Sequence, residues 1–264
     1  MLSRVCIFIT ALLLLPGTIN SQQTPTASTQ PSTILAQSLA AMGGASNVSD
    51  ITLTGTVERI VGSDDETGSA SYKAIATANR MDLSLSSGTR TEIRAIGANG
   101  PGGNWIGPDG VVHEISHHNL LTDAGWFPVF TLNNLVSASD GVLTYIGPDT
   151  KNGISVIHIQ FSLQQPNLTG SAGTIRQHLT QVDFYVDASS FLPVVLDFST
   201  HPDGNALIDI AVEFQFSDYR TVGSSKIPFH VQESLNGSLY LDVQFQEATF
   251  NTGLNSTSTI FTIQ

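Results

Sequence analysis

Apolar and polar residues alternate with a period of two through most of the second half of the chain. This pattern is typical of β-strands that bury one face and expose the other. Short turns containing Gly, Asn, Asp or Pro separate the runs, which therefore predict an antiparallel meander with one apolar face. The runs lie in residues 157–163, 182–186, 192–198, 208–216, 227–231 and 239–245.

The first half predicts one helix followed by further strands. We expect the helix to begin at a cap formed by Ser32 or Thr33 and to end at Gly43-Gly44. Its apolar stripe is formed by Leu35, Leu39 and Met42. The period-two pattern then begins, and strands are expected near residues 51–61, 69–78, 81–86, 90–97, 103–106 and 111–115.

Residues 116–139 interrupt this alternation and are rich in large apolar side chains. Pro128 suits a first helical turn, so we expect a helix within residues 125–138. Its apolar residues cover more than one face, which means that the helix is buried on several sides or covers an apolar opening. We expect Trp126, Phe127 and Phe130 to rest on the mouth of the sheet and to contact a bound ligand.

These elements predict a mainly β (α+β) fold. The sequence predicts about ten strands and only two helices, and the apolar face of the sheet must be buried. A curved antiparallel sheet or half-open β-barrel, with an N-terminal helix and a mid-chain lid helix, meets that need.

The first 21 residues have the layout of a secretory signal peptide, with Arg4 before an apolar run at residues 5–15. That run is shorter than the about 20 residues of a membrane-spanning helix. We therefore predict a signal peptide (1–21), a flexible leader (22–33) and a single β domain (34–264). The product is expected to be periplasmic or extracellular, with no membrane-spanning segment after cleavage. The only cysteine is Cys6, which lies in the predicted signal peptide, so we expect no disulfide in the mature protein.

The net charge of the chain disfavours some classes of binding partner. The formal net charge is −12, with 10 Lys+Arg against 22 Asp+Glu. Such a chain repels phosphate backbones and anionic lipid surfaces, so nucleic acid is not an expected partner.

The string His113-Glu114-Ile115-Ser116-His117 matches the H-E-x-x-H pattern of zinc peptidases. That pattern needs both histidines one turn apart on a helix, whereas Val111-Val112 predict that His113 continues a strand. Histidines four apart on a strand lie about 13 Å from each other. No third ligand follows at the usual spacing either, so we expect no stoichiometric metal and no cofactor.

Three charged residues fall at strand positions that otherwise carry apolar side chains. Arg59 continues the face of Ile51, Leu53 and Val57, where it either meets a ligand carboxylate or phosphate at a cavity rim or extends into water. Glu233 and Glu247 are either a carboxylate pair inside a barrel or residues at strand ends that reach solvent.

Two C-terminal stretches carry a resemblance. FYVDASSFLPVVLDF has an aspartate, a short turn and Leu-Pro before a new strand, and VEFQFSDYRTVGSSKIPFHV has Asp-Tyr-Arg, a turn and Ile-Pro before another. With the closing FNTGL, residues 181–254 resemble the final meander of the LolA/LolB-like bacterial lipoprotein-carrier superfamily. The resemblance implies a half-open barrel whose helices cover an apolar cavity for acyl chains or lipidated proteins.

Three hypotheses follow. The first is a non-enzymatic periplasmic carrier whose partner is an apolar small molecule, a lipid or a lipidated protein. The second is a zinc-dependent hydrolase using His113, Glu114 and His117. The third is an envelope structural or interaction module whose barrel is filled with side chains.

Overall fold

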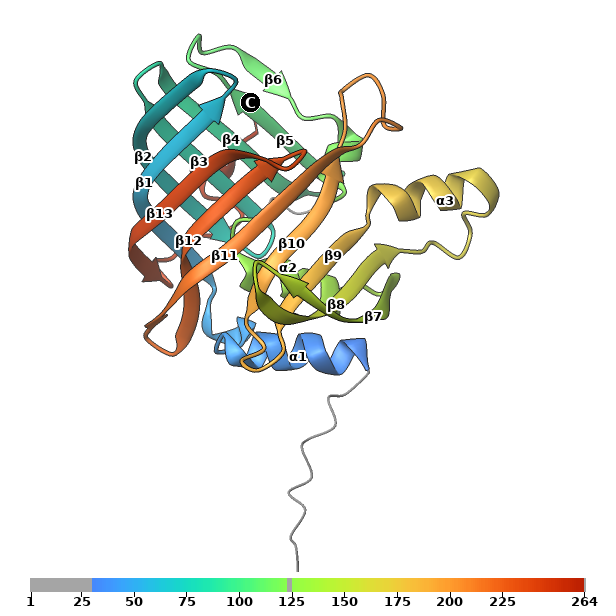
Figure 1. Ribbon diagram of the computed structural model, residues 1–264. Helices are drawn as coiled ribbons and strands as arrows, with labels where there is room; N and C mark the ends of the chain where they lie inside the picture. The colour runs from blue at the N-terminus through green and yellow to red at the C-terminus, as the bar shows by residue number, and fades with distance from the viewer. Residues whose placement is uncertain (1–29, 123–124, 264) are drawn as a thin grey trace, which may run out of the picture.

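The computed structural model describes residues 30–122 and 125–263. The predicted signal peptide and residues 22–29 of the predicted leader lie outside this part of the chain, whereas residues 31–33, predicted as the end of that leader, begin the first helix. The described residues form one antiparallel sheet of 13 strands, in the order β6-β5-β4-β3-β2-β1-β13-β12-β11-β10-β9-β8-β7. The sheet curls strongly and remains open, because its edge strands β6 and β7 are not paired with each other (Figure 1).

Strands that follow one another along the chain are neighbours in each half, and most connections are short, apart from the one between β8 and β9, which contains a helix. β1 pairs with β13 to join the two halves. Their bounds are β1 Asp50–Val61, β2 Asp64–Ile75, β3 Ala78–Leu85, β4 Gly88–Gly97, β5 Gly100–Ile106, β6 Val112–Glu114, β7 Gly141–Lys151, β8 Ile154–Leu163, β9 Val182–Asp187, β10 Pro193–Thr200, β11 Ile210–Val222, β12 Ser225–Leu235 and β13 Ser238–Phe250.

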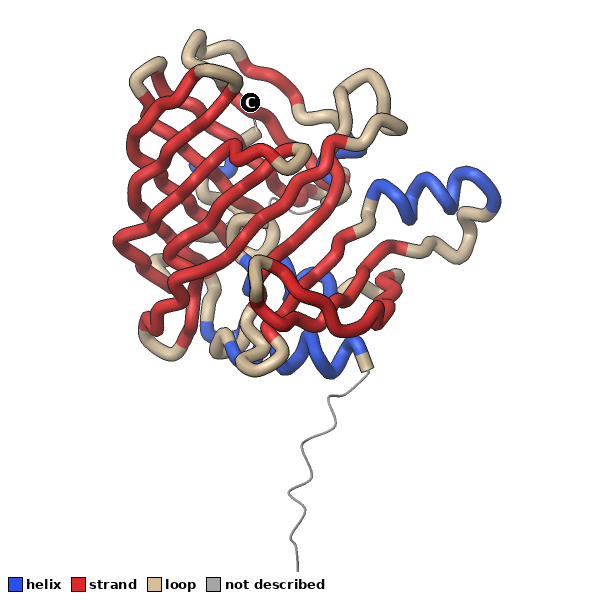
Figure 2. The backbone as a smooth tube through the Cα atoms, viewed as in Figure 1, coloured by secondary structure: helices blue, strands red, loops and turns tan. Residues whose placement is uncertain are grey.

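Three α-helices accompany the sheet in the described residues: α1 Pro31–Ala41, α2 Pro128–Ser137 and α3 Gly170–Leu179. Short 3₁₀ turns are η1 Ala45–Asn47, η2 His117–Leu120 and η3 Thr259–Phe261. α1 and α2 lie together at one side of the curved sheet, whereas α3 projects between β8 and β9 (Figures 1 and 2). Every helix here is too short or too polar to cross a bilayer.

The concave face and α2 form one continuous apolar core. The alternating residues of β11, β12 and β13 are buried on this face, as their period-two pattern predicts. Trp126, Phe127 and Phe130 are 5%, 1% and 5% exposed and belong to the same cluster. A mid-chain helix packed on the apolar face of the sheet is therefore confirmed, although it begins at Pro128, so that Trp126 and Phe127 lie just before it. α1 also contacts α2, which explains why α2 is apolar on more than one side.

The first helix differs from its prediction by a small shift. It begins at Pro31, with Gln30 as the N-cap, rather than at a Ser32 or Thr33 cap. Proline at the first helical position lacks only an N–H that has no intrahelical partner there, so it starts the helix at no hydrogen-bonding cost. Ile34 and Leu35 of this helix and its C-cap residue Met42 are fully buried, whereas Leu39 of the predicted stripe is only partly buried.

Two elements were absent from the sequence-based expectation. α3 has a single buried residue, Leu179, and so lacks the apolar stripe that reveals a surface helix. β7 is an edge strand whose alternation is broken by a bulge between Tyr145 and Gly147 and by Pro148. The sequence showed twelve alternating runs, and β7 is the thirteenth strand of the described residues.

Two of the alternating runs predicted as strands differ from the strands observed in the structure. β11 begins at Ile210, and Ile208 is 52% exposed in the preceding loop. The run at residues 192–198 is interrupted by a bulge between Pro193 and Val195. This bulge places Val194 in a second small cluster with Val156, Tyr185 and Val195 instead of in the main core.

Candidate functional site

A cavity of about 430 Å³ lies between α2 and the first half of the sheet. We call it the lid cavity. Its walls come from β2 to β5, η2, α2 and β8, and most of its lining is apolar. Prominent lining residues are Tyr72, Ala76, Leu120, Phe130, Leu135 and Phe161. Its volume falls in the range of small-molecule sites, about 300–1,000 Å³.

A second cavity, of about 450 Å³, lies on the concave face between β1, β3 to β5 and β10 to β13. We call it the arginine cavity, because Arg59, Arg90 and Arg94 all line it. Met81, Leu83, Trp126, Phe214 and Leu241 supply apolar walls. Arg94 lines both cavities, so the two spaces share one wall.

The structure separates the predicted ligand-binding residues between these cavities. Arg59 and Trp126 line the arginine cavity, and Phe130 lines the lid cavity. Phe127 lines neither; its ring packs edge-on against Phe130, with centroids 5.0 Å apart. Phe127 is therefore a core residue that supports Phe130.

The three arginines differ in their partners. Arg59 Nη1 lies 3.2 Å from Glu66 Oε2, and the two side chains are 11% and 12% exposed, so Arg59 does not extend into water. Arg94 donates to Glu92 Oε1 at 2.6 Å and to the carbonyl of Asn119 at 3.0 Å. Arg90 forms no ion pair with the described residues, and its buried Nε has no hydrogen-bond partner among them.

Strand register explains why sequence reasoning missed Arg90, Glu92 and Arg94. These residues alternate along β4, as residues of a solvated face do. In the sheet, Arg90 pairs with Leu83 and Glu92 pairs with Met81, two residues of the concave core. Only the pairing of β3 with β4 therefore shows that these charges face inward.

Glu233 also faces the arginine cavity, between Phe214 and Leu241 in the register. Burial, together with the charge of Glu92, raises the pKa of Glu233 to about 8, although Arg94 acts in the opposite direction. At neutral pH this carboxyl is mostly protonated and can donate a hydrogen bond. Glu247 pairs with Thr54 and is exposed, so the structure does not bring the two glutamates together as an acid–base pair.

The raised pKa of Glu233 has a consequence for stability. The folded protein holds a proton that the unfolded chain releases near its ordinary pKa of 4.5, so the stability of the wild type should fall as pH rises toward 8. Glu233→Gln removes this loss, and we expect it to stabilise the protein by about 2 kcal/mol at pH 8 and by little at pH 5. Urea midpoints at both pH values measure the difference. Equal pH dependence in the two proteins would show that Glu233 titrates normally.

The H-E-x-x-H string does not form a metal site in this structure. His113 lies on β6 and stacks on Trp105, with ring centroids 3.9 Å apart and planes at 10°. His117 begins η2 and is exposed, so the two histidines do not share a helix face. Among the described residues, neither belongs to a group of side chains placed to hold an ion.

Comparisons with known proteins support the fold and stop short of a family assignment. No protein-family model matches the sequence, and no curated protein matches it. Solved structures do match. A putative outer membrane lipoprotein-sorting protein domain from Vibrio parahaemolyticus aligns with a TM-score of 0.55 at 13% identity, over 86% of this chain and 94% of that one.

Two further structures agree. A DUF1329 family protein from Desulfovibrio piger aligns with a TM-score of 0.54 at 9% identity, over 85% of this chain and 95% of that one. A LolA superfamily protein from Nitrosomonas europaea aligns with a TM-score of 0.51 at 9% identity, over 88% and 97%. At these identities the likeness speaks for the fold alone, and the chain has the LolA-like fold that its C-terminal meander predicted.

Proposed function

We propose that this protein is an exported, non-enzymatic carrier for a lipid-like molecule or a lipidated protein. The observation that carries the proposal is the pair of cavities, about 430 and 450 Å³, on the concave face beside α2. A barrel filled with side chains would not contain cavities of this size, because protein interiors are normally close-packed. The LolA-like fold and the signal-peptide layout of residues 1–21 support the same proposal.

The polar groups favour a ligand with an acidic head group. Arg90 has no ion-pair partner among the residues that the structure describes, and a carboxylate or phosphate can pair with a guanidinium in a bidentate geometry. Glu233, protonated at neutral pH, adds a hydrogen-bond donor instead of a repelling charge. In this arrangement the acyl chain occupies the lid cavity and the head group lies beside Arg90.

The hydrolase hypothesis has less support, because His113 and His117 lie on different kinds of element and Glu114 is exposed. The structural-module hypothesis differs from the carrier in one respect, namely whether the cavities admit an apolar molecule. Binding is therefore the property to measure.

A titration with a fluorescent fatty acid tests the proposal. We expect saturable binding of one or two probe molecules per chain, which an unlabelled fatty acid displaces and the uncharged alcohol of equal length displaces less well. Arg90→Gln should remove most of this preference for the acid. If the probe does not bind saturably, the carrier proposal fails; if acid and alcohol compete equally, only the assignment of the head group fails.

A further inference from the structure

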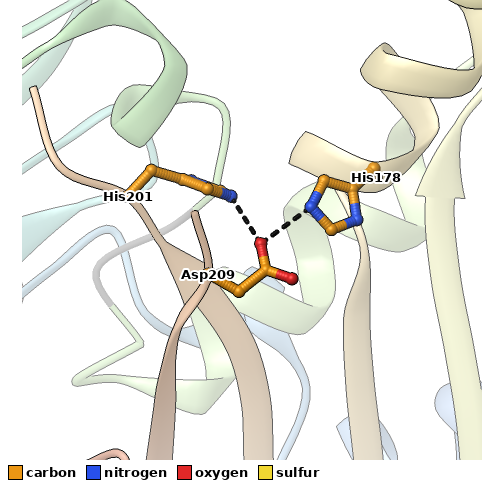
Figure 3. Close-up of side chains that lie close together, drawn as sticks. All are labelled: His178, His201 and Asp209. Carbon is orange, nitrogen blue, oxygen red and sulfur yellow. Dashed lines mark hydrogen bonds and ion pairs between the residues drawn. The ribbon is translucent and has the colours of Figure 1, made fainter. Parts of the chain in front are cut away.

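Three side chains from different elements of the fold converge outside the two cavities. His178 comes from the last turn of α3, His201 from the residue after β10 and Asp209 from the residue before β11. Both rings direct a nitrogen at the same carboxylate oxygen (Figure 3). His178 Nε2 lies 2.8 Å from Asp209 Oδ1, and His201 Nε2 lies 3.1 Å from it.

The side chain of Asn119 fixes the backbone of His201 through two hydrogen bonds. The backbone N–H of His201 donates to Asn119 Oδ1 at 2.9 Å, and the side-chain amide of Asn119 donates to the carbonyl of His201 at 2.8 Å. The His201 side chain is 1% exposed, whereas those of His178 and Asp209 are 41% and 49% exposed. The cluster therefore has one fixed, buried member and two members that face solvent.

The chemistry of these groups suits a transition metal. Neutral imidazole nitrogens and a carboxylate oxygen are the usual ligands of Zn²⁺, and three protein ligands leave a fourth position for water or substrate. A neutral ring is the form that donates a lone pair to a metal.

The spacing also fits. Ligand atoms about 2.0–2.1 Å from a tetrahedral Zn²⁺ are separated from each other by about 3.3 Å. The distances of 2.8 and 3.1 Å are already close to this value, and all three ligand atoms lie within 4.8 Å of one another. The side chains of His178 and Asp209 face solvent, so both can rotate to admit an ion.

The surroundings attract cations as well. His178 and Asp209 line a surface groove of about 430 Å³ that continues past Asp183, Asp197 and Glu213. Lys151 pairs with Asp197 and Glu213. With one lysine against these three carboxyl groups and Asp209, the groove is acidic on balance, and a net negative charge raises the local concentration of cations.

We infer that His178, His201 and Asp209 form a binding site for a divalent transition-metal ion such as Zn²⁺. This departs from the sequence-based expectation of no bound metal, which rested on the His113–His117 string. The ion ties the end of α3 to the β10–β11 loop and, through Asn119, to η2. Arg176 of α3 and His117 of η2 both line the lid cavity, so the metal fixes two elements at the border of that cavity.

Equilibrium dialysis of the metal-stripped protein against Zn²⁺, followed by elemental analysis, tests this inference. We expect one Zn²⁺ per chain, and an affinity weakened by about 100-fold or more in His178→Ala and in Asp209→Asn. Both side chains are largely exposed, so both variants should fold. Zn²⁺ should also raise the melting temperature of the wild type but not that of either variant.

His230→Ala is the matched control. His230 pairs with Asp242 at 2.8 Å, much as His178 pairs with Asp209, but it has no second histidine at that oxygen. This variant should bind Zn²⁺ as the wild type does. The inference is overturned if the wild type retains no zinc, or if His178→Ala and His230→Ala bind it equally.

Discussion

Replacing Phe130 with aspartate is expected to lower the free energy of unfolding by about 4 kcal/mol, because the change removes a large core side chain and buries a charge. Phe130 is 5% exposed and packs on Phe127 inside the continuous core between α1, α2 and the sheet. The same substitution should abolish fatty-acid binding, since Phe130 also lines the lid cavity. Denaturant titration measures the first effect and probe fluorescence the second.

Val136→Asp provides the comparison on the same helix. Val136 is 41% exposed and lines neither cavity, so its replacement should change stability by less than about 1 kcal/mol. If Phe130→Asp were no more destabilising than Val136→Asp, α2 would not be packed in the core as the structure places it.

Filling the lid cavity should separate binding from stability. Leu135 on α2 is partly buried and faces this cavity, so Leu135→Trp places a large ring into space that is otherwise empty. We expect fatty-acid affinity to fall by about 10-fold or more, which corresponds to about 1.4 kcal/mol. Stability should change by less than about 1.5 kcal/mol, since the added atoms need not displace packed neighbours.

Val136→Trp is the control, because it adds the same ring at the adjacent, exposed position. Its fatty-acid affinity should match that of the wild type. Undiminished binding by Leu135→Trp would place the ligand outside the lid cavity.

Elements of the fold were predicted correctly where the sequence carried a strong local signal, such as regular alternation of apolar residues or a proline at a helix start. The alternating runs of the C-terminal meander became β11 to β13, and Pro128 began α2 as expected. The prediction was poorer where the signal was weak or interrupted. α3 has almost no buried residue, and the bulge before Gly147 hid β7.

The candidate site was predictable only in part. Arg59 and Trp126 were found because a cation and a large ring stood out from their local patterns, and both line the arginine cavity. Arg90 was missed, because its inward direction depends on the register of β3 with β4. The metal cluster was missed for a similar reason: His178 and Asp209 are 31 residues apart in sequence and meet only through the fold.

Native mass spectrometry of the protein purified from its natural source tests the carrier proposal most directly. The proposal predicts that a fraction of the protein carries an extra mass in the range of a fatty acid or a lipid, lost on denaturation and reduced in Leu135→Trp. If wild-type protein carries only the mass of the polypeptide, with or without a metal ion, and also fails to take up added fatty acid, the carrier account is wrong.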